Sequence, residues 1–186
     1  MRKLIWFNMA TVDGFFAGPN AEIDWHRVDD EFNQFAIDQL KSAGGLLFGR
    51  VTYEIMASYW PTSLATANDP VVAAKMNSLL KVVFSRSLEG AGWNNTRLLR
   101  ENIPGEVAQL KQERGKDLFL LGSARLAATL IQTRLIDEYR IMVNPVVLGC
   151  GQPLFQGVKE RLGLRLLGTR TFHNGNVLLR YEPDTE

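Results

Sequence analysis

The chain has 186 residues, of which 46% are hydrophobic and 22% are charged. This balance is typical of a globular protein with a sizeable core and excludes a disordered, highly charged chain. The formal net charge of +1 excludes the strongly basic composition typical of nucleic-acid binders. The single cysteine, Cys150, excludes an internal disulfide framework, and we expect its side chain to be at least half buried.

The first residues, MRKLIWFNMATVDG, combine two basic residues with an apolar run. The run is interrupted at Asn8 and meets Asp13, so we do not expect a signal peptide. No apolar run approaches the roughly 20 residues that span a bilayer. No linker-like or repetitive segment divides the sequence. We therefore expect a cytoplasmic protein with a single domain, residues 1–186.

Short apolar blocks alternate with amphipathic stretches through the first three quarters of the chain. The apolar blocks predict buried strands at residues 3–10, 45–49, 81–85 and 117–122. The amphipathic stretches predict helices at residues 29–43, 51–60, 69–80, 103–115 and 123–135. Asp69 and Pro70 suit the start of the third helix, and Gly115 suits the end of the fourth.

The last quarter of the chain changes to strands alone. Residues 137–149, 164–172 and 176–183 are strand-like, and His173–Asn176 predicts a hairpin turn. The whole pattern predicts an α/β fold with three layers, αβα. Its twisted sheet is expected to be mostly parallel, with antiparallel strands at the C-terminal end.

Three of the predicted strands end in similar groups. These ends read Gly49-Arg50-Val51-Thr52, Ser85-Arg86-Ser87 and Gly122-Ser123-Ala124-Arg125. Each offers backbone N–H groups at or near a helix start, a hydroxyl and a guanidinium, which together suit phosphate oxygens. Ligands of open α/β sheets bind at the carboxyl ends of strands, so three such ends favour a ligand with several phosphates. NADPH fits better than NADH, because its extra phosphate requires an additional cation.

The common nucleotide-binding motifs are absent. Gly44, Gly45 and Gly49 do not have the spacing of a Rossmann fingerprint, and no Walker pattern occurs. A bound dinucleotide would therefore occupy a different kind of cradle. His26 and His173 are the only histidines, and no cysteine cluster exists, so we expect no catalytic metal.

Taken together, LLFGRVTYEIM, KVVFSRSL, LFLLGSARLAATL and LIDEYRIMVNPVVLGCGQPLF resemble the dihydrofolate-reductase-like superfamily. The chain is most similar to the group containing the reductase domain of the bifunctional riboflavin-biosynthesis deaminase–reductase. NMATVDGFFAG resembles that group's first-strand loop, and the resemblance covers nearly the whole chain. It implies a three-layer fold that binds NADPH and reduces a heteroaromatic or ribosylamino substrate, such as a pterin or a 5-amino-6-ribosylaminouracil.

The resemblance also implies which residues contact the cofactor. On the first loop, Ala10 and Thr11 would approach the nicotinamide. Ser85 and Arg86 would lie near the adenosine ribose phosphate, and Arg125 adds positive charge nearby. The remaining phosphate contacts are expected from Gly49, Arg50, Thr52, Gly122, Ser123 and Ala124.

Candidate catalytic residues on the acceptor side are Asp13, Asp24 and Trp25. Asp13 is either a substrate-side carboxylate or a turn-former before Gly14. Asp24 could relay a proton or be a solvated loop acid. The candidate pocket residues are His26, Pro145, Gly149 and Gly151, the last three of which form either a pocket wall or a dimer contact.

Two features of the reductase families are missing. The prolines that usually surround the tryptophan of folate reductases are absent around Trp25. The acid that usually precedes a glycine pair in riboflavin reductases is absent too, since the segment reads Leu120-Leu121-Gly122-Ser123. A non-catalytic nucleotide-binding module and a ribonucleotide or phosphosugar enzyme therefore remain alternatives. The strand-rich last quarter predicts a homodimer, because it leaves an edge or face to be covered.

Overall fold

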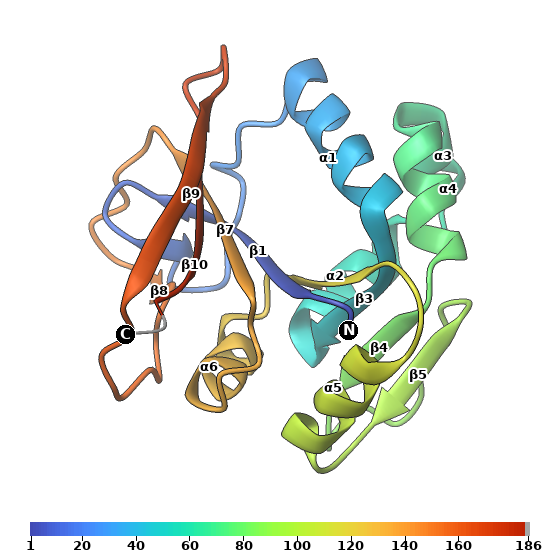
Figure 1. Ribbon diagram of the computed structural model, residues 1–186. Helices are drawn as coiled ribbons and strands as arrows, with labels where there is room; N and C mark the ends of the chain where they lie inside the picture. The colour runs from blue at the N-terminus through green and yellow to red at the C-terminus, as the bar shows by residue number, and fades with distance from the viewer. Residues whose placement is uncertain (185–186) are drawn as a thin grey trace.

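The computed structural model describes residues 1–184, which fold around one large sheet (Figure 1). The strands are β1 (Leu4–Thr11), β2 (Phe15–Ala17), β3 (Ala43–Gly49), β4 (Lys81–Phe84), β5 (Thr96–Leu99), β6 (Asp117–Leu121), β7 (Glu138–Asn144), β8 (Gln152–Pro153), β9 (Leu164–Thr171) and β10 (Val177–Pro183). The helices are α1 (Asp30–Ser42), α2 (Arg50–Tyr59), α3 (Ser63–Asn68), α4 (Pro70–Ser78), α5 (Ile103–Gln112) and α6 (Ala124–Gln132).

The sheet has eight strands in the order β5-β4-β3-β6-β1-β7-β10-β9. The first six are mutually parallel, and β10 runs antiparallel to both β7 and β9. Strands β2 and β8 pair separately as a small antiparallel sheet. The predicted α/β architecture, mostly parallel with antiparallel strands at the C-terminal end, is confirmed.

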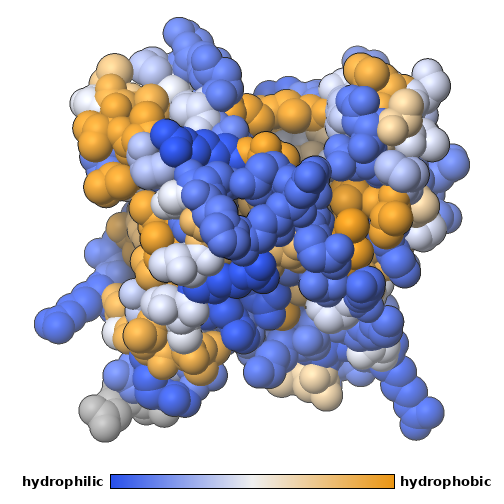
Figure 2. Space-filling model, turned by 90° about the horizontal axis from the view of Figure 1, so that it is seen from above, coloured by the Kyte–Doolittle hydropathy of each residue, from blue (hydrophilic) through white to orange (hydrophobic). Residues whose placement is uncertain are grey.

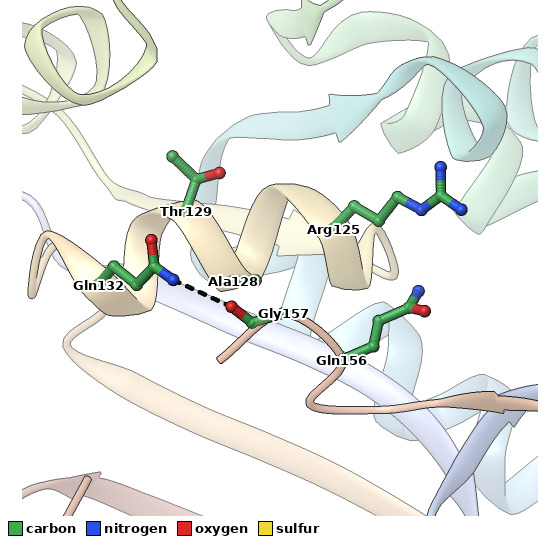
Figure 3. A pocket seen from close by; sticks show the side chains of 6 residues that line it. All are labelled: Arg125, Ala128, Thr129, Gln132, Gln156 and Gly157. Carbon is green, nitrogen blue, oxygen red and sulfur yellow. Dashed lines mark hydrogen bonds between the residues drawn. The ribbon is translucent and has the colours of Figure 1, made fainter. Parts of the chain in front are cut away.

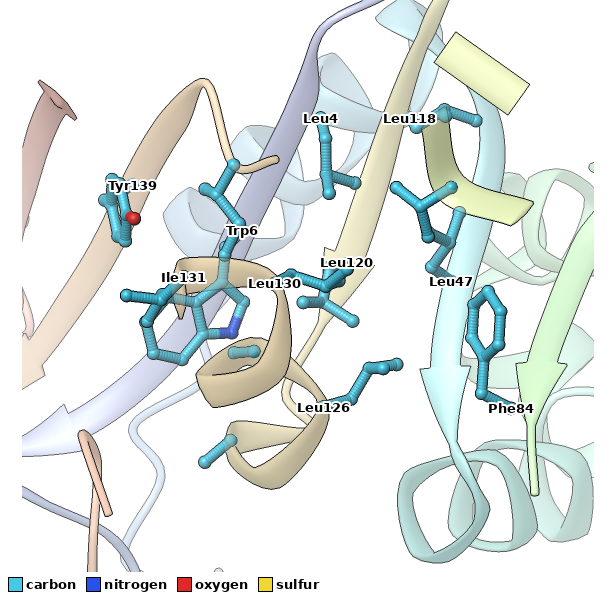
Figure 4. Close-up of a cluster of buried hydrophobic side chains, with 14 of the residues drawn as sticks. Leu4, Trp6, Leu47, Phe84, Leu118, Leu120, Leu126, Leu130, Ile131 and Tyr139 are labelled. Carbon is cyan, nitrogen blue, oxygen red and sulfur yellow. The ribbon is translucent and has the colours of Figure 1, made fainter. Parts of the chain in front are cut away.

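Helices cover the sheet on both faces (Figure 1). Side chains of α5 and α6 pack with Leu4 and Trp6 of β1, while α1, α2 and α4 pack with Ile5 on the opposite face. Trp6 is completely buried in the first of these clusters, edge-on to Tyr139 (Figure 4). Successive side chains of a strand point to opposite faces of the sheet, so β1 contributes to the core on both faces.

Helix α1 begins where its sequence predicts. The Asp29 carboxylate accepts a hydrogen bond from the Phe32 N–H at 2.9 Å and caps the helix. Asp30 and Glu31 lie in the first turn, where the helix dipole favours negative charge. The other predicted helices and strands are also present, with ends that differ by a few residues.

Four short elements were not predicted: α3 and the strands β2, β5 and β8. Their sequences are brief and partly polar, and β2 and β8 have only three and two residues. Such segments carry little periodicity of their own, so their conformation depends on the neighbours with which they pair. Strand β5 matters most here, because it extends the parallel sheet beyond β4.

The expectation for Cys150 was wrong, because its side chain is exposed. It lies in a surface loop between β7 and β8, next to Gly149, whose φ is +75°. The glycines on either side allow this loop to turn over the surface instead of entering the core. None of the described helices is long and apolar enough to cross a membrane.

Candidate functional site

The ends of β3 and β6 lie side by side in the sheet. Their register pairs Leu47 with Leu120, so two residues further on Gly49 and Gly122 face each other. The Gly49 N–H donates a hydrogen bond to Oγ of Ser123 at 2.9 Å. A Cβ on Gly122 would lie 3.3 Å from Cγ2 of Thr52, so the two strand-to-helix junctions touch. Gly122 is therefore required for this close approach.

The junction between β6 and α6 is anchored to β1. The Gly122 N–H donates to the Phe7 carbonyl at 2.9 Å, and the Gly122 carbonyl accepts from Nε1 of Trp6 at 2.8 Å. Gly122 and Ser123 both adopt left-handed backbone conformations, with φ of +56° and +57°. Trp6 thus connects the buried core directly to the start of α6.

Neither α2 nor α6 has a side-chain hydrogen bond capping its first turn. Gly49 precedes α2 and has no side chain to offer, while the Ser123 hydroxyl is directed at Gly49. The first-turn N–H groups of Val51, Thr52 and Arg125 are therefore left without intrahelical partners. Paired N–H groups of this kind, with the positive end of two helix dipoles, favour an anion.

The third junction, Ser85-Arg86-Ser87, differs from the prediction. No helix starts here, since the chain turns through a loop into β5. Oγ of Ser85 accepts from the N–H groups of Ser87 and Leu88 at 3.2 and 2.9 Å and closes this turn. The expectation of a helix start was wrong, because the serine hydroxyl satisfies these donors and β5 pairs with β4.

Arg100, which follows β5 directly, was not among the residues predicted for the site. Its guanidinium donates to the carbonyls of Arg86 and Glu89, both at 3.2 Å, so the two arginines come from adjacent strand ends. The signal in the sequence is an arginine after the apolar pair Leu98-Leu99. This signal identifies Arg100 as a strand-end residue only if residues 96–99 are recognised as a strand.

The other two arginines of the predicted site have different surroundings. Arg50 is exposed and forms an ion pair with Glu54, N to O 2.8 Å, one turn along α2. Arg125 is exposed on α6 and lines a pocket of about 320 Å³. Figure 3 shows its side chain extending beside that of Gln156 toward the same end of the pocket. The Arg125 side chain thus extends away from α6, past its N-terminal end (Figure 3).

Ala10 was expected as the last residue of the strand at 3–10 and also, with Thr11, on the first loop, and the loop placement was wrong. Both belong to β1, because they pair with Val143 and Asn144 of β7 and are buried. The pairing of Thr11 with Asn144 of β7 extends the strand by one residue beyond its predicted end at Ala10. The backbone of Ala10 and Thr11 still reaches the carboxyl edge of the sheet, next to the β6 end.

Asp13 connects two loops at this edge. Its carboxylate accepts hydrogen bonds from the N–H groups of Leu148 and Gly149, at 3.3 and 2.7 Å. The hydroxyl of Thr11 and these N–H groups lower the pKa of Asp13, so the carboxylate is ionised at neutral pH. Gly14 follows with a φ of +84°, as the turn requires.

The predicted pocket residues between β7 and β8 pack on neighbouring loops. A Cβ on Gly151 would collide with the carbonyl of Ala17 in β2, so glycine is required there. Pro145 lies beside Gly175 in the β9–β10 hairpin turn. Gly149 donates to Asp13, as described above. These residues hold the loop against its surroundings.

Asp24, Trp25 and His26 lie on the segment between β2 and α1. Asp24 is exposed, whereas the Trp25 and His26 rings meet edge-to-face with centroids 4.4 Å apart. Burial lowers the pKa of His26 to about 4, so the imidazole is neutral at pH 7. Nε1 of Trp25 and Nε2 of His26 are buried and find no hydrogen-bond partner within residues 1–184. These two nitrogen atoms are the unsatisfied polar groups of this segment.

Glu138, the first residue of β7, is buried within the sheet. Its carboxylate accepts from Nε of Arg140 at 2.8 Å and of Arg180 at 2.9 Å. Tyr53 is buried in the core, and its hydroxyl accepts from the backbone N–H of Trp93. Among residues 1–184 no group of three or more His, Cys, Asp or Glu side chains could hold a metal ion.

In the sheet, β4, β3, β6 and β1 are consecutive, so the three junctions and the end of β1 form one row. The two uncapped helix starts, of α2 and α6, therefore lie between the Ser85–Ser87 turn and the end of β1. Residues 2–178 of the chain match the model of the RibD C-terminal domain family.

The chain belongs to the RibD C-terminal domain family. Over 180 residues it is 36% identical to the uncharacterized protein YyaP of Bacillus subtilis, a match covering 97% of this chain and 94% of YyaP. The assignment therefore extends over almost the full length of this RibD C-terminal domain protein.

Solved structures share the fold of this RibD C-terminal domain protein at low identity. One is a diaminohydroxyphosphoribosylaminopyrimidine deaminase/5-amino-6-(5-phosphoribosylamino)uracil reductase from Thermotoga maritima, with TM-score 0.70 and 13% identity. The match covers 98% of this chain and 57% of that one. Another is dihydrofolate reductase from Enterococcus faecalis, with TM-score 0.64, 12% identity and coverage of 98% and 96%. The dihydrofolate-reductase-like fold is confirmed.

Proposed function

We propose that the protein is an NADPH-dependent reductase that transfers a hydride to a small heteroaromatic or ribosylamino molecule. The observation that carries the proposal is the pair of uncapped helix starts, α2 and α6, joined by the Gly49–Ser123 hydrogen bond. Two helix N-termini in contact provide backbone donors for a diphosphate. Arg86 and Arg100 lie beyond them, at the position suited to a further phosphate.

The comparisons support the same activity. The Thermotoga protein is named as a reductase, and the Enterococcus enzyme was solved in complex with NADP(H). Membership of the RibD C-terminal domain family covers nearly the whole chain. Each of these facts concerns the relatives, and together with the donor set described above they favour a nicotinamide dinucleotide as the ligand of this protein.

The residues present fit such a cofactor, which would supply the hydride when bound. Backbone N–H groups of α2 and α6 would hold the pyrophosphate, and Gly122 would allow the backbone to come close. Arg86 and Arg100 would bind the ribose phosphate through charge-assisted hydrogen bonds. Ala10 and Thr11 would border the nicotinamide at the carboxyl edge of β1.

The acceptor side, in this proposal, is formed by the Asp13 loop and the Trp25–His26 pair. Asp13 is ionised and His26 is neutral at pH 7, so neither is suited to donate a proton as a strong general acid. Water would then supply the proton after hydride transfer. The Trp25 and His26 rings, packed edge-to-face, would form a wall of this side.

A non-catalytic nucleotide-binding module is the second candidate. The lack of a general acid and the apolar Leu121 before Gly122 favour it. This candidate predicts that NADPH binds but is not oxidised in the presence of pterin, ribosylaminopyrimidine or quinone acceptors. A screen of these acceptors by loss of nicotinamide absorbance separates the two candidates.

The first test is a titration with NADPH and NADH, followed by nicotinamide fluorescence. We expect NADPH to bind at least about tenfold more tightly, because only NADPH carries the phosphate that the arginines would bind. Arg86→Ala should weaken NADPH binding about tenfold and leave NADH binding nearly unchanged. Arg114→Ala is the matched control, since Arg114 is exposed and precedes β6 at the opposite edge of the sheet.

Absence of binding by both nucleotides would overturn the proposal. Competition by phosphate esters in that case would favour a ribonucleotide or phosphosugar enzyme instead. Equal affinities for NADPH and NADH, unchanged in Arg86→Ala, would remove the assignment of Arg86 while leaving a dinucleotide site.

A further inference from the structure

We propose that Ser123 is a positioning residue that fixes the N-termini of α2 and α6 relative to each other and thereby aligns their N–H groups for one diphosphate. The inference rests on the proposed function and deepens it. Ser123 does not bind the ligand through its hydroxyl in this scheme. It acts through Gly49, which lies 74 residues away in the sequence.

The single O–H donor of the Ser123 hydroxyl, the group that could bind an anion, is used within the protein. Oγ accepts from the Gly49 N–H at 2.9 Å and lies 3.0 Å from the carbonyl of Leu121, to which it donates. The serine therefore connects the end of β3 to the end of β6 at the point where their backbone pairing stops. Past the last backbone pair of β3 and β6, the Gly49 N–H therefore donates to a serine hydroxyl instead of a backbone carbonyl.

The position is unusual for a serine. Ser123 has a φ of +57°, a conformation that glycine adopts without strain and other residues at a cost. A serine that bears backbone strain in place of a glycine is explained if its hydroxyl is needed.

The bond to Gly49 also leaves the start of α6 open. A serine at an N-cap ordinarily accepts from the N–H groups of the first turn, but this one turns away from them. The N–H groups of Ala124, Arg125 and Leu126 thus stay available to a ligand. Packing reinforces the alignment, since Gly122 and Thr52 are in close contact across the same junction.

The test compares Ser123→Ala with Ser123→Gly. Both variants lose the hydroxyl, but only glycine accepts the left-handed backbone without strain, so the two should differ in thermal stability. If the hydroxyl acts by positioning, both variants should bind NADPH about tenfold more weakly than the wild type, irrespective of their stability. Ser58→Ala, on the exposed side of α2 near its C-terminal end, is the control and should bind NADPH normally.

Amide hydrogen exchange at Gly49, measured by NMR, gives a readout that does not depend on the ligand. The Gly49 N–H should exchange slowly in the wild type and faster in both Ser123 variants. Unchanged exchange, or wild-type affinity in Ser123→Gly together with weak binding in Ser123→Ala, would overturn the inference, because backbone strain would then explain the effect. Wild-type protein that binds neither NADPH nor NADH would instead refute the proposed function.

Discussion

At the scale of single residues, the site depends on side chains whose partners are distant in the sequence. Ser123 and Gly49 form a hydrogen bond, and Arg100 meets the turn that carries Arg86. The residue types could be selected from the sequence, since glycine, serine and arginine at strand ends suit phosphate. The contacts between these residues could not be predicted from the sequence, because the order of strands in the sheet determines which of them meet.

His26 gives a prediction for the dependence of stability on pH. Its pKa is about 4 in the folded protein and about 6.5 when unfolded, so between these values only the unfolded chain binds the proton. Stability should therefore be lost as the pH falls from about 6.5 to about 4, by at most about 3 kcal/mol from this group. Urea unfolding of wild type and His26→Gln across this range measures the difference.

The variant should lose less stability than the wild type over that interval, and below about pH 4 the two curves should become parallel. His173→Gln is the comparison variant: the His173 side chain is 96% exposed on the β9–β10 hairpin and lies 2.9 Å from Glu31, so the variant should lose that surface pair and keep the His26 effect. Parallel curves for wild type and His26→Gln over the whole range would contradict the assignment of a buried, neutral imidazole.

At the scale of elements, most helices and strands follow from local pattern. Apolar spacing predicted α1, and the apolar blocks predicted β1, β3, β4 and β6. The exceptions are α3, β2, β5 and β8, which have few residues and gain stability from pairing or packing. The junction after β4 was wrongly assigned to a helix start for the same reason, since β5 had not been recognised.

The end of α4 provides a prediction on stability. Lys81 in β4 is completely buried, and its Nζ donates to the carbonyls of Met76, Asn77 and Leu79, at 2.8, 3.0 and 2.8 Å. The ammonium also lies 4.5 Å from the centre of the Trp93 ring. Lys81→Met should reduce the free energy of unfolding by about 2–4 kcal/mol, because it leaves these carbonyls without their donor.

Denaturation in guanidinium chloride measures this loss. Lys75→Met is the control, since Lys75 lies in the last turn of the same helix but is only half buried. We expect a change within about 0.5 kcal/mol for the control. Similar stabilities for the two variants would show that the buried ammonium is replaceable by an apolar group.

At the scale of the whole molecule, β9 forms one edge of the sheet and is mostly exposed (Figure 1). Leu166 and Leu167 on this strand are 52% and 38% exposed. Its arginines, Arg165 and Arg170, are paired within the chain with Glu182 and Glu31. An unpaired edge with exposed leucines and neutralised charges favours association with a second copy.

We therefore propose a homodimer formed through β9. On the face drawn in Figure 2, hydrophobic side chains form separate patches with hydrophilic ones between them, so we do not place the contact there. Light scattering should give a dimer mass, and Leu166→Lys combined with Leu167→Lys should shift it toward the monomer. Val71→Lys, at an equally exposed apolar position on α4, should leave the dimer intact. A monomeric wild type at all concentrations would remove this proposal.

The sequence by itself determined the class of the fold and the kinds of groups at its strand ends. Apolar periodicity specifies helix or strand locally, and glycine, serine and arginine carry their chemistry wherever they lie. Only the tertiary structure decided which strand ends adjoin and that Thr11 still belongs to β1. It alone decided that Ser123 holds Gly49. The physical reason is that parallel strands pair through residues far apart in the chain, so the contacts between junctions depend on the packing of the whole sheet.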